Sequence, residues 1–471
     1  ECQGWGEGPG RAPMVHGLSA GGGASAAGVP VPFLGPATPC ARPCGCGHPR
    51  GRSHAGPSSH RSRGQTVAGV GGPCRRVGDT AGFAVTGLRL TGVGTAVPDH
   101  RLTQVEAVEL HASFCGFDEG RSRTLRALYR RSGVSTRHSV LLNDSEGELR
   151  NRQRFYPPAQ HQGDLGPTTL QRMAAYEEHA PALAVTAARR ALESGQVASE
   201  EVTHLVTVSC TGFVAPGVDS RIVEELGLRR RVRRTHVGFM GCYGALAALR
   251  VVDAIVTADP EAVPLLCSVE LCTLHFSYAW DTELLVANAL FSDGAAAAVG
   301  RGAGCGGGVG SGGGVGSGGG VSNPDIGTSQ GLWQVAATGT HLLAEAEDAM
   351  TWRIGDHGFH MTLSPRIPDL IEATLRPWLE GWLAEHDLTV TDIASWAIHP
   401  GGPRVLSSCR RALDLPREAT QASEAVLREC GNMSSATVLF ILERMSRQGA
   451  DGPCVALAFG PGLAIEATLL T

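Results

Sequence analysis

Three residues in distant parts of the sequence have the side-chain types of a cysteine-based acyl-transfer site. Cys242 lies in the stretch GFMGCYGALAAL, His399 in AIHPGGP and Asn432 in CGNMSSAT. A thiolate can take an acyl group from a thioester, while an imidazole and an amide can stabilise a negatively charged oxygen. Together the three residues predict acyl-transfer chemistry on a nucleophilic cysteine.

The sequence around each of these residues predicts a corner at which a helix begins. Gly241 and Gly244 allow a sharp turn between an extended run and an Ala- and Leu-rich run. A helix N-terminus beside Cys242 would favour its thiolate form. Pro403 suits the first turn of a helix, and Asn432 precedes an apolar run with helical spacing. Such corners can bring three polar side chains to one point.

Alternating strand and helix patterns predict an α/β layered core around these corners. The folded part opens with a strand that ends in a glycine-punctuated turn near residue 98. We expect helices over 103–115, 120–131, 168–194, 218–227, 366–386 and 402–413, and strands over 203–209, 332–338, 394–398, 453–459 and 463–470.

Composition divides the chain into four parts. Residues 1–82 are rich in Gly, Pro, Ala and Arg without periodicity, which predicts a disordered low-complexity head. Residues 84–301 form a first half that carries Cys242, and 322–471 a second half that carries the histidine and the asparagine. A Gly-Gly-Gly-Val-Gly-Ser repeat over 302–321 predicts a flexible surface insertion between them.

The overall composition excludes several classes of function. The sequence contains no lysine, which excludes Schiff-base, pyridoxal-phosphate and P-loop chemistry. A net charge of -5 argues against a general nucleic-acid binder, and we expect no membrane span. The 14 cysteines are dispersed, which favours a reducing, cytoplasmic setting. Plastid targeting remains an alternative, because the head has no acidic residue between Glu7 and Asp79.

Six motifs in a fixed order make the chain from about residue 84 to 471 resemble the type III polyketide synthases, the chalcone synthase-like branch of the thiolase superfamily. The motifs are GCYG, NALFSDGAA, GFHM, HPGGP, GNMSS and FGPG. The resemblance implies a thiolase-like αβαβα fold built from two similar halves. It also implies a homodimer in which each subunit has a complete active site.

The resemblance further implies a role for each motif. Cys242 would take the starter from an acyl-CoA, with His399 as its ion-pair partner, and His399 and Asn432 would hold the malonyl thioester oxygen during decarboxylation. Phe291 and Phe359 would be gatekeepers of the cavity. Further residues at family positions that shape the cavity are Thr211, Cys272, Leu274, His275, Met350 and Ser434.

Substrate binding is implied by the same family. Arg131 matches a basic residue at the mouth of the CoA tunnel, and Arg126 is its neighbour on the same expected helix. Met350 stands where plant chalcone synthases have glycine, so the cavity would be narrowed there. Acyl-CoA and malonyl-CoA would be substrates, with no cofactor and no metal.

The sequence is also compatible with other functions. An acyl-carrier-dependent ketosynthase of the initiating type shares the Cys, His and Asn, although the FGPG ending favours the CoA-dependent branch. A degradative thiolase would need a second cysteine in that ending, and an HMG-CoA synthase an acidic base that has no candidate. A catalytically inactive scaffold paralogue is the alternative from another class.

Overall fold

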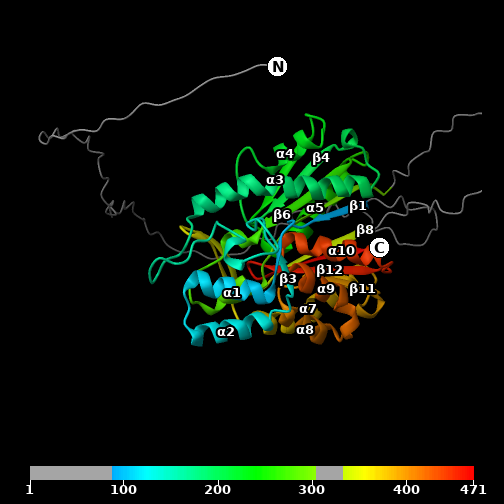
Figure 1. Cartoon of the computed structure of the whole chain (residues 1–471). Helices are drawn as coiled ribbons and strands as arrows, with labels where there is room; N and C mark the ends of the chain where they lie inside the picture. The colour runs from blue at the N-terminus through cyan, green and yellow to red at the C-terminus, as the bar shows by residue number, and fades with distance from the viewer. Residues whose placement is uncertain (1–86, 304–332) are drawn as a thin grey trace, which may run out of the picture. The chain divides into compact units, whose positions relative to one another are not determined.

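A nine-stranded mixed sheet runs through the computed structural model, which describes residues 87–303 and 333–471 (Figure 1). The predicted head and most of the glycine-rich insertion lie outside the described residues. The strands follow the order β11-β12-β13-β8-β1-β7-β6-β4-β5. Their bounds are β1 Leu88–Ala96, β4 His204–Ser209, β5 Arg233–Gly238, β6 Pro264–Leu271, β7 Asp293–Gly302, β8 Trp333–Leu342, β11 Ser395–Ile398, β12 Cys454–Gly460 and β13 Ala464–Leu470.

The two halves of the chain meet at β1. This strand pairs antiparallel with β7 of the first half and with β8 of the second, so that Leu90 lies between Gly300 and Trp333. Parallel pairs occur once in the second half, β11 with β12, and twice in the first, where β4 pairs with β5 and β6. The chain therefore forms one continuous sheet from two segments of similar plan.

Helices form three layers around the strands. α3 (Thr169–Ser194) covers the outer face of β1, β6 and β7, while α7 (Ile367–Ala384) and α8 (Pro403–Leu413) cover the strands of the second half. α5 (Gly244–Ala258) and α10 (Thr437–Arg447) share a central core with strands of both halves (Figure 1). The two halves of the sheet lie on either side of the central helices, and each half is covered on its outer face by the helices of its own half. The layers therefore follow the expected order αβαβα.

Strand β12 shows how the sequence specifies these layers. Cys454, Ala456 and Ala458 contribute to the central core, whereas the alternate residues Val455 and Leu457 contribute to the core under α7 and α8. Successive side chains of a strand point to opposite faces. A strand covered by helices on both faces is therefore apolar throughout, as the sequence of β12 is.

The remaining elements include those that line the site described below. They are α1 (Gln104–Cys115), α2 (Glu119–Arg130), α4 (Val218–Glu225), α6 (Thr282–Leu290), α9 (Gln421–Cys430), the hairpin of β9 (Met350–Gly355) and β10 (Gly358–Leu363), and the small sheet of β2 (Arg101–Thr103) and β3 (Thr136–His138). Every helix expected from the sequence is present within two residues of its predicted bounds. The β9–β10 hairpin and α6 were not expected.

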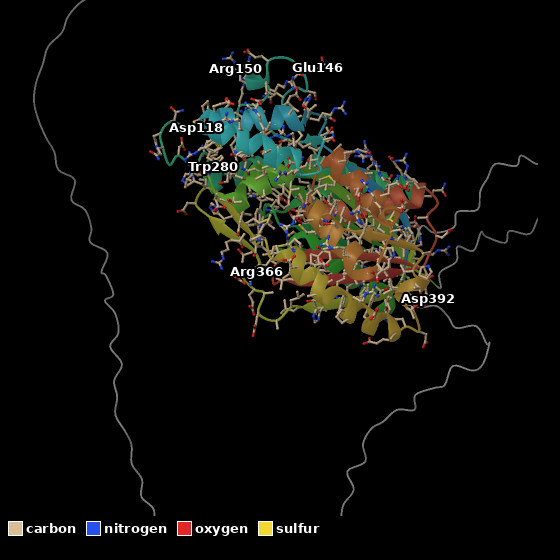
Figure 2. All side chains as sticks on the ribbon, turned by 90° about the horizontal axis from the view of Figure 1, so that it is seen from below. Asp118, Glu146, Arg150, Trp280, Arg366 and Asp392 are labelled. Carbon is tan, nitrogen blue, oxygen red and sulfur yellow. The ribbon has the colours of Figure 1, made fainter. Side chains whose placement is uncertain are left out.

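One segment among the described residues, Gly241–Ala258, is long and apolar enough to cross a membrane by length and composition. Its window is 61% buried inside the protein, because α5 belongs to the central core. A core helix passes the same test, so the segment is weak evidence for a membrane span. Charged side chains such as Glu146, Arg150 and Asp392 stand at the periphery instead (Figure 2).

Candidate active site

Cys242 lies at the corner between β5 and α5, where the sequence predicts it. It belongs to a short 3₁₀ turn, Gly241–Tyr243, that continues directly into α5. Gly241 has φ +72°, and a Cβ added there would lie 2.3 Å from Cδ of Pro461. The glycine is therefore required both by its backbone conformation and by the close approach of the β12–β13 turn.

His399 is the residue that follows β11, and its side chain is 1% exposed. Its backbone N–H donates to the Leu457 carbonyl at 2.7 Å, which fixes the position of His399 along β12. Neither ring nitrogen has a hydrogen-bond partner among the described residues. Because buried polar atoms are normally satisfied, this imidazole is free to bond a ligand in the cavity that it lines.

Asn432 is joined to the Phe291 segment through the backbone. The Asn432 N–H donates to the Leu290 carbonyl, and the Ser292 N–H donates to the Asn432 carbonyl, each at 2.9 Å. The Asn432 Oδ1 accepts the N–H of Ser434 at 2.9 Å, which leaves Nδ2 to donate elsewhere. The amide is thus oriented by a turn and by a neighbouring chain segment.

Burial favours the neutral thiol of Cys242 and the neutral imidazole of His399. Burial raises the pKa of the Cys242 thiol to about 12, against hydrogen bonds from Ser434 and Asn432 that lower it. Burial also lowers the pKa of His399 to about 3. The ion pair expected from the resemblance is therefore opposed by desolvation of its two members. Burial therefore favours a neutral thiol on Cys242 and a neutral imidazole on His399, which line the same cavity.

An outer cavity of about 780 Å³ joins the three residues. Cys242, His399 and Asn432 all line it. Its walls come from α2, α6, the β9–β10 hairpin and the start of α8, and Arg131 also lines it. The three corners predicted from the sequence therefore open onto one cavity.

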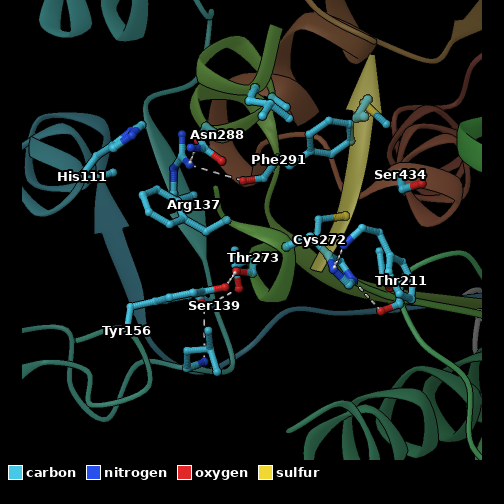
Figure 3. Close-up of a pocket in the computed structure, with 18 of the residues that line it drawn as sticks. His111, Arg137, Ser139, Tyr156, Thr211, Cys272, Thr273, Asn288, Phe291 and Ser434 are labelled. Carbon is cyan, nitrogen blue, oxygen red and sulfur yellow. Dashed lines mark hydrogen bonds between the residues drawn. The ribbon is translucent and has the colours of Figure 1, made fainter. Parts of the chain in front are cut away.

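An inner cavity of about 120 Å³ adjoins the outer one. Cys242, Phe291, Met350 and Met361 line both cavities and so mark their junction. Other predicted residues that line the inner cavity are Thr211, Cys272, His275, Phe359 and Ser434. In Figure 3, Phe291, Cys272, Thr211 and Ser434 lie on one side of this pocket, and His111 and Tyr156 lie on the other.

His275 holds one wall of the inner cavity through its two ring nitrogens. Nδ1 accepts the N–H of Phe359 at 3.0 Å, so that Nε2 donates to the Thr211 carbonyl at 2.7 Å. The Phe359 ring stacks on the imidazole at 4.2 Å between centroids. Burial lowers the pKa of His275 to about 3, which keeps this arrangement neutral.

Two predicted residues lie away from the cavities. Leu274 is fully buried in the core beneath α3, because successive residues of the 3₁₀ turn Cys272–His275 point in different directions. Arg126 bonds Glu109 and Glu119 and lines neither cavity. Of the two predicted CoA-binding arginines, only Arg131 lies at the outer cavity.

Glu270 is a buried polar residue beside the site that sequence reasoning missed. Its carboxylate accepts the Cys210 N–H, the Thr211 hydroxyl at 2.7 Å and the Ser435 hydroxyl. Burial raises its pKa to about 7. A single acidic residue within the mostly apolar strand β6 is the signal that could have identified it.

Arg137 is a second buried polar residue missed in the sequence. It lines the inner cavity, and its guanidinium donates to the carbonyls of Asn288 and Ala289, each at 2.6 Å, and to Phe291 at 3.4 Å. These carbonyls belong to the C-terminal end of α6. Arg137 therefore fixes the backbone on which Phe291 is placed, as Figure 3 shows.

Both halves of the chain match the domains of one known protein family. Residues 79–304 match the N-terminal domain of chalcone and stilbene synthases, and residues 334–471 match the C-terminal domain. A 1,3,6,8-tetrahydroxynaphthalene synthase from Streptomyces peucetius is 36% identical over 82% of this chain and 93% of its own length. The alpha-pyrone synthesis polyketide synthase-like Pks18 of Mycobacterium tuberculosis is 32% identical over 81% and 90%.

Solved structures give the same assignment. A polyketide synthase from the brown alga Ectocarpus siliculosus superposes with a TM-score of 0.70 at 29% identity, covering 82% of this chain and 98% of the other. The tetrahydroxynaphthalene synthase of Streptomyces coelicolor gives 0.67 at 27% identity, covering 81% and 98%. The fold is therefore thiolase-like, and the chain belongs to the chalcone and stilbene synthase family of type III polyketide synthases.

Proposed function

We propose that this chain condenses a starter acyl-CoA with malonyl-CoA by repeated decarboxylative Claisen condensation on Cys242, His399 and Asn432. The main support is that these three side chains line one cavity, in which both ring nitrogens of His399 lack a hydrogen-bond partner among the described residues. No cofactor is required by this chemistry. The names of the two bacterial relatives support an aromatic polyketide or a pyrone as the product class.

In the first step Cys242 attacks the starter thioester. The neutral His399 accepts the thiol proton as the sulfur–acyl bond forms, and CoA leaves as its thiol after taking a proton back. Ser434 and Asn432 stabilise negative charge on the sulfur through hydrogen bonds. Moving the proton during the attack avoids a free thiolate, which burial disfavours.

In the second step a malonyl-CoA loses carbon dioxide. The carbon–carbon electron pair moves into an enolate whose oxygen is held by Nδ2 of Asn432 and by an N–H of His399. A fixed donor at such an oxygen contributes about 3–4 kcal/mol to the transition state. The enolate carbon then attacks the acyl group on Cys242, which frees the cysteine thiolate and leaves the lengthened chain as a CoA thioester. Attack of this thiolate on that thioester returns the chain to Cys242 and releases CoA before a further cycle.

Phe291 stands between the outer cavity, in which both steps occur, and the inner cavity. It is the C-cap of α6, and residues of this helix line both cavities. An apolar ring there excludes water from the enolate, which would otherwise be protonated. The growing chain would enter the inner cavity, where Met350, Thr211 and Cys272 restrict its length.

The proposed active form is a homodimer. Strand β5 is the outer edge of the nine-stranded sheet, and its residues are largely exposed. Phe213 and Phe239 beside it are 53% and 37% exposed. An exposed edge strand flanked by aromatic side chains supports pairing with a second copy. Light scattering of the purified chain tests this assembly.

The test of function is mass spectrometry of products from the purified chain, malonyl-CoA and a panel of aromatic and fatty acyl-CoA starters. We expect starter-dependent polyketides or pyrones without a carrier protein. Cys242→Ala should abolish extension, and His399→Gln should lose both acylation and decarboxylation. Arg189→Ala, an exposed change on α3, serves as the control with full activity.

Two results would contradict the proposal. Turnover that appears only with an acyl-carrier protein would indicate a ketosynthase of the initiating type. A wild-type chain that forms no product with either donor, and whose Cys242 reacts with iodoacetamide no faster than the other cysteines, would indicate an inactive scaffold.

A further inference from the structure

One face of α1 lines the inner cavity, and a single polar residue interrupts this apolar face. The residues of α1 that line the cavity are Ala107, Leu110, His111 and Phe114, at the spacing of one helix face. His111 is 1% exposed, so its polar ring is buried in an otherwise apolar part of the wall. Buried polar atoms are normally paired, and the two ring nitrogens of His111 differ in this respect.

The Nδ1 atom of His111 is bonded to a tyrosine. It lies 2.8 Å from the hydroxyl oxygen of Tyr129, which is 3.3 Å from the Asn288 carbonyl oxygen. That carbonyl already accepts the guanidinium of Arg137 at 2.6 Å. Because tyrosine has one hydroxyl proton and the contact with Nδ1 is the shorter, the hydroxyl donates to Nδ1. The proton of the neutral imidazole is then on Nε2.

The ring of His111 is neutral and held in place. Burial, together with the positive charge of Arg137, lowers the pKa of His111 to about 3. Phe276 packs edge-on against the imidazole with 4.6 Å between the ring centroids, and the Phe117 centroid lies at 5.6 Å. The Nε2–H group is therefore a fixed donor, which loses little freedom when an acceptor binds to it.

The Nε2 atom of His111 has no hydrogen-bond partner within residues 87–303 and 333–471. It is the one buried side-chain nitrogen or oxygen of the inner-cavity wall that stands unpaired in these two ranges. By contrast, the Tyr156 hydroxyl donates to the Thr273 carbonyl at 2.7 Å, and the Gln153 amide donates to the Tyr156 carbonyl at 3.0 Å. Because an unpaired buried N–H is unfavourable, the cavity suits a ligand that brings an oxygen to this atom.

Cys242 lies on the side of the inner cavity opposite His111. Cys242 lines this cavity and is hydrogen-bonded to Ser434. In Figure 3, Ser434 lies on one side of the pocket and His111 on the other. An acyl chain bonded to Cys242 that enters the inner cavity therefore extends toward His111.

We propose that His111 selects starter acyl groups with a hydroxyl or keto oxygen at their far end, by donating a hydrogen bond from Nε2 to that oxygen. This inference rests on the proposed function, because the acyl group is taken to be bonded to Cys242. An apolar chain end leaves the N–H of His111 buried without a partner, whereas an oxygen satisfies it. Tyr129 is a positioning residue, since its hydroxyl fixes which nitrogen of His111 carries the proton.

The experiment compares paired starters that differ by one oxygen. The probes are hexanoyl-, octanoyl- and decanoyl-CoA with their ω-hydroxy counterparts, and phenylpropanoyl-CoA with its para-hydroxy counterpart. Calorimetry measures the Kd of each probe for Cys242→Ala, which keeps the thioester intact, with and without His111→Leu. Product formation with malonyl-CoA gives kcat/KM for each starter with the wild type, His111→Leu and His111→Gln.

Two further variants separate hydrogen bonding from packing. Phe114→Leu is the matched control, because Phe114 lies on the same face of α1, lines the same cavity and has no polar side-chain atom. It changes the volume of the cavity without changing its hydrogen bonds. Tyr129→Phe removes the hydroxyl that bonds Nδ1 of His111, so it should weaken the preference for oxygen while apolar starters react as before.

We expect the wild type to favour the oxygen-bearing member of at least one pair by about threefold to tenfold in kcat/KM, and Cys242→Ala to show the same preference in Kd. His111→Leu should remove this preference by weakening the hydroxylated probe and strengthening the apolar one. His111→Gln retains an N–H donor and should keep part of the preference. Phe114→Leu should keep all of it.

The inference is overturned if neither binding nor turnover distinguishes the members of any pair. It is also overturned if His111→Leu changes both members of a pair equally, because the residue would then act on packing alone. If His111→Leu does not fold, an unchanged preference in Tyr129→Phe contradicts the inference instead. A failure of the proposed function gives a different result, in which no starter yields product although the paired probes still differ in Kd.

Discussion

Phe291 and Asn432, 141 positions apart in the chain, form an isolated parallel β-bridge in which the backbone of Asn432 is hydrogen-bonded to the residues on either side of Phe291. Phe291, the proposed gate, belongs to the first half, and Asn432, the proposed donor to the enolate, belongs to the second. Because two backbone hydrogen bonds join these segments, the two residues keep a fixed relative position. Replacing either side chain leaves this bridge intact, which makes both roles testable by mutation.

Asn432→Ala should separate the two half-reactions. Decarboxylation of malonyl-CoA should fall by about 10²–10³-fold, because one of two enolate donors is lost. Acylation of Cys242 by the starter should fall much less, since its attack needs no enolate. Release of labelled carbon dioxide and the mass of the acylated protein measure the two steps. Equal losses in both steps would contradict this assignment.

Gly241→Ala should damage both stability and activity. Its positive φ costs about 1–2 kcal/mol for a residue with a Cβ, and that Cβ would meet Pro461 at 2.3 Å. Gly116→Ala is the matched control, because Gly116 has φ +60° and nothing within 4 Å of the added atom. Urea unfolding should show a larger loss for Gly241→Ala, and only this variant should lose turnover.

Glu270 should make stability depend on pH. Burial raises the pKa of Glu270 in the folded chain from its ordinary value of 4.5 to about 7, so between these values the folded chain binds more protons than the unfolded chain. Stability contributed by the protonated carboxyl is present below about pH 4.5 and is lost by about pH 7, by roughly 3 kcal/mol. Glu270→Gln cannot ionise and should flatten this decline.

Urea midpoints of wild type and Glu270→Gln at pH 5 and pH 8 measure the effect. The exposed change Glu200→Gln should keep the wild-type decline. If Glu270→Gln loses stability over this range as steeply as the wild type, then burial of Glu270 is not its cause.

Met350→Ala should change the products. Met350 lines both cavities and is 6% exposed, so its truncation enlarges their junction. Met445→Ala is a control of similar burial, 5% exposed, in the central core. Both variants should lose about 2–5 kcal/mol of stability, but only Met350→Ala should accept longer starters or add more malonyl units. Identical product profiles for the two variants would contradict a role for Met350.

The sequence predicted the parts of this structure that depend on local patterns. The apolar alternation in β12, Pro403 at the start of α8 and the glycines around Cys242 each specify their element without reference to distant residues. The family motifs also predicted that Cys242 and Asn432 belong to one site. These features are local because helix starts and strand faces are set by a few neighbouring side chains.

The parts that the sequence did not predict depend on tertiary contacts. Arg126 and Arg131 lie on the same helix, and only their partners distinguish them: Arg126 faces Glu109 of α1, whereas Arg131 faces the cavity. Leu274 lies next to His275, yet Leu274 packs in the core beneath α3 whereas His275 lines the inner cavity. The neutral state of His399 follows from burial that no local pattern reveals.

The contact between Gly241 and Pro461 has a consequence for synthesis on the ribosome. The nucleophile turn is complete only when the β12–β13 turn, made more than two hundred residues later, packs against it. At 5–20 residues per second that delay is roughly 10–40 s. During translation, Cys242 in the nascent first half is therefore not yet enclosed by the second half. The site for acyl transfer is complete only after the second half has packed against the first.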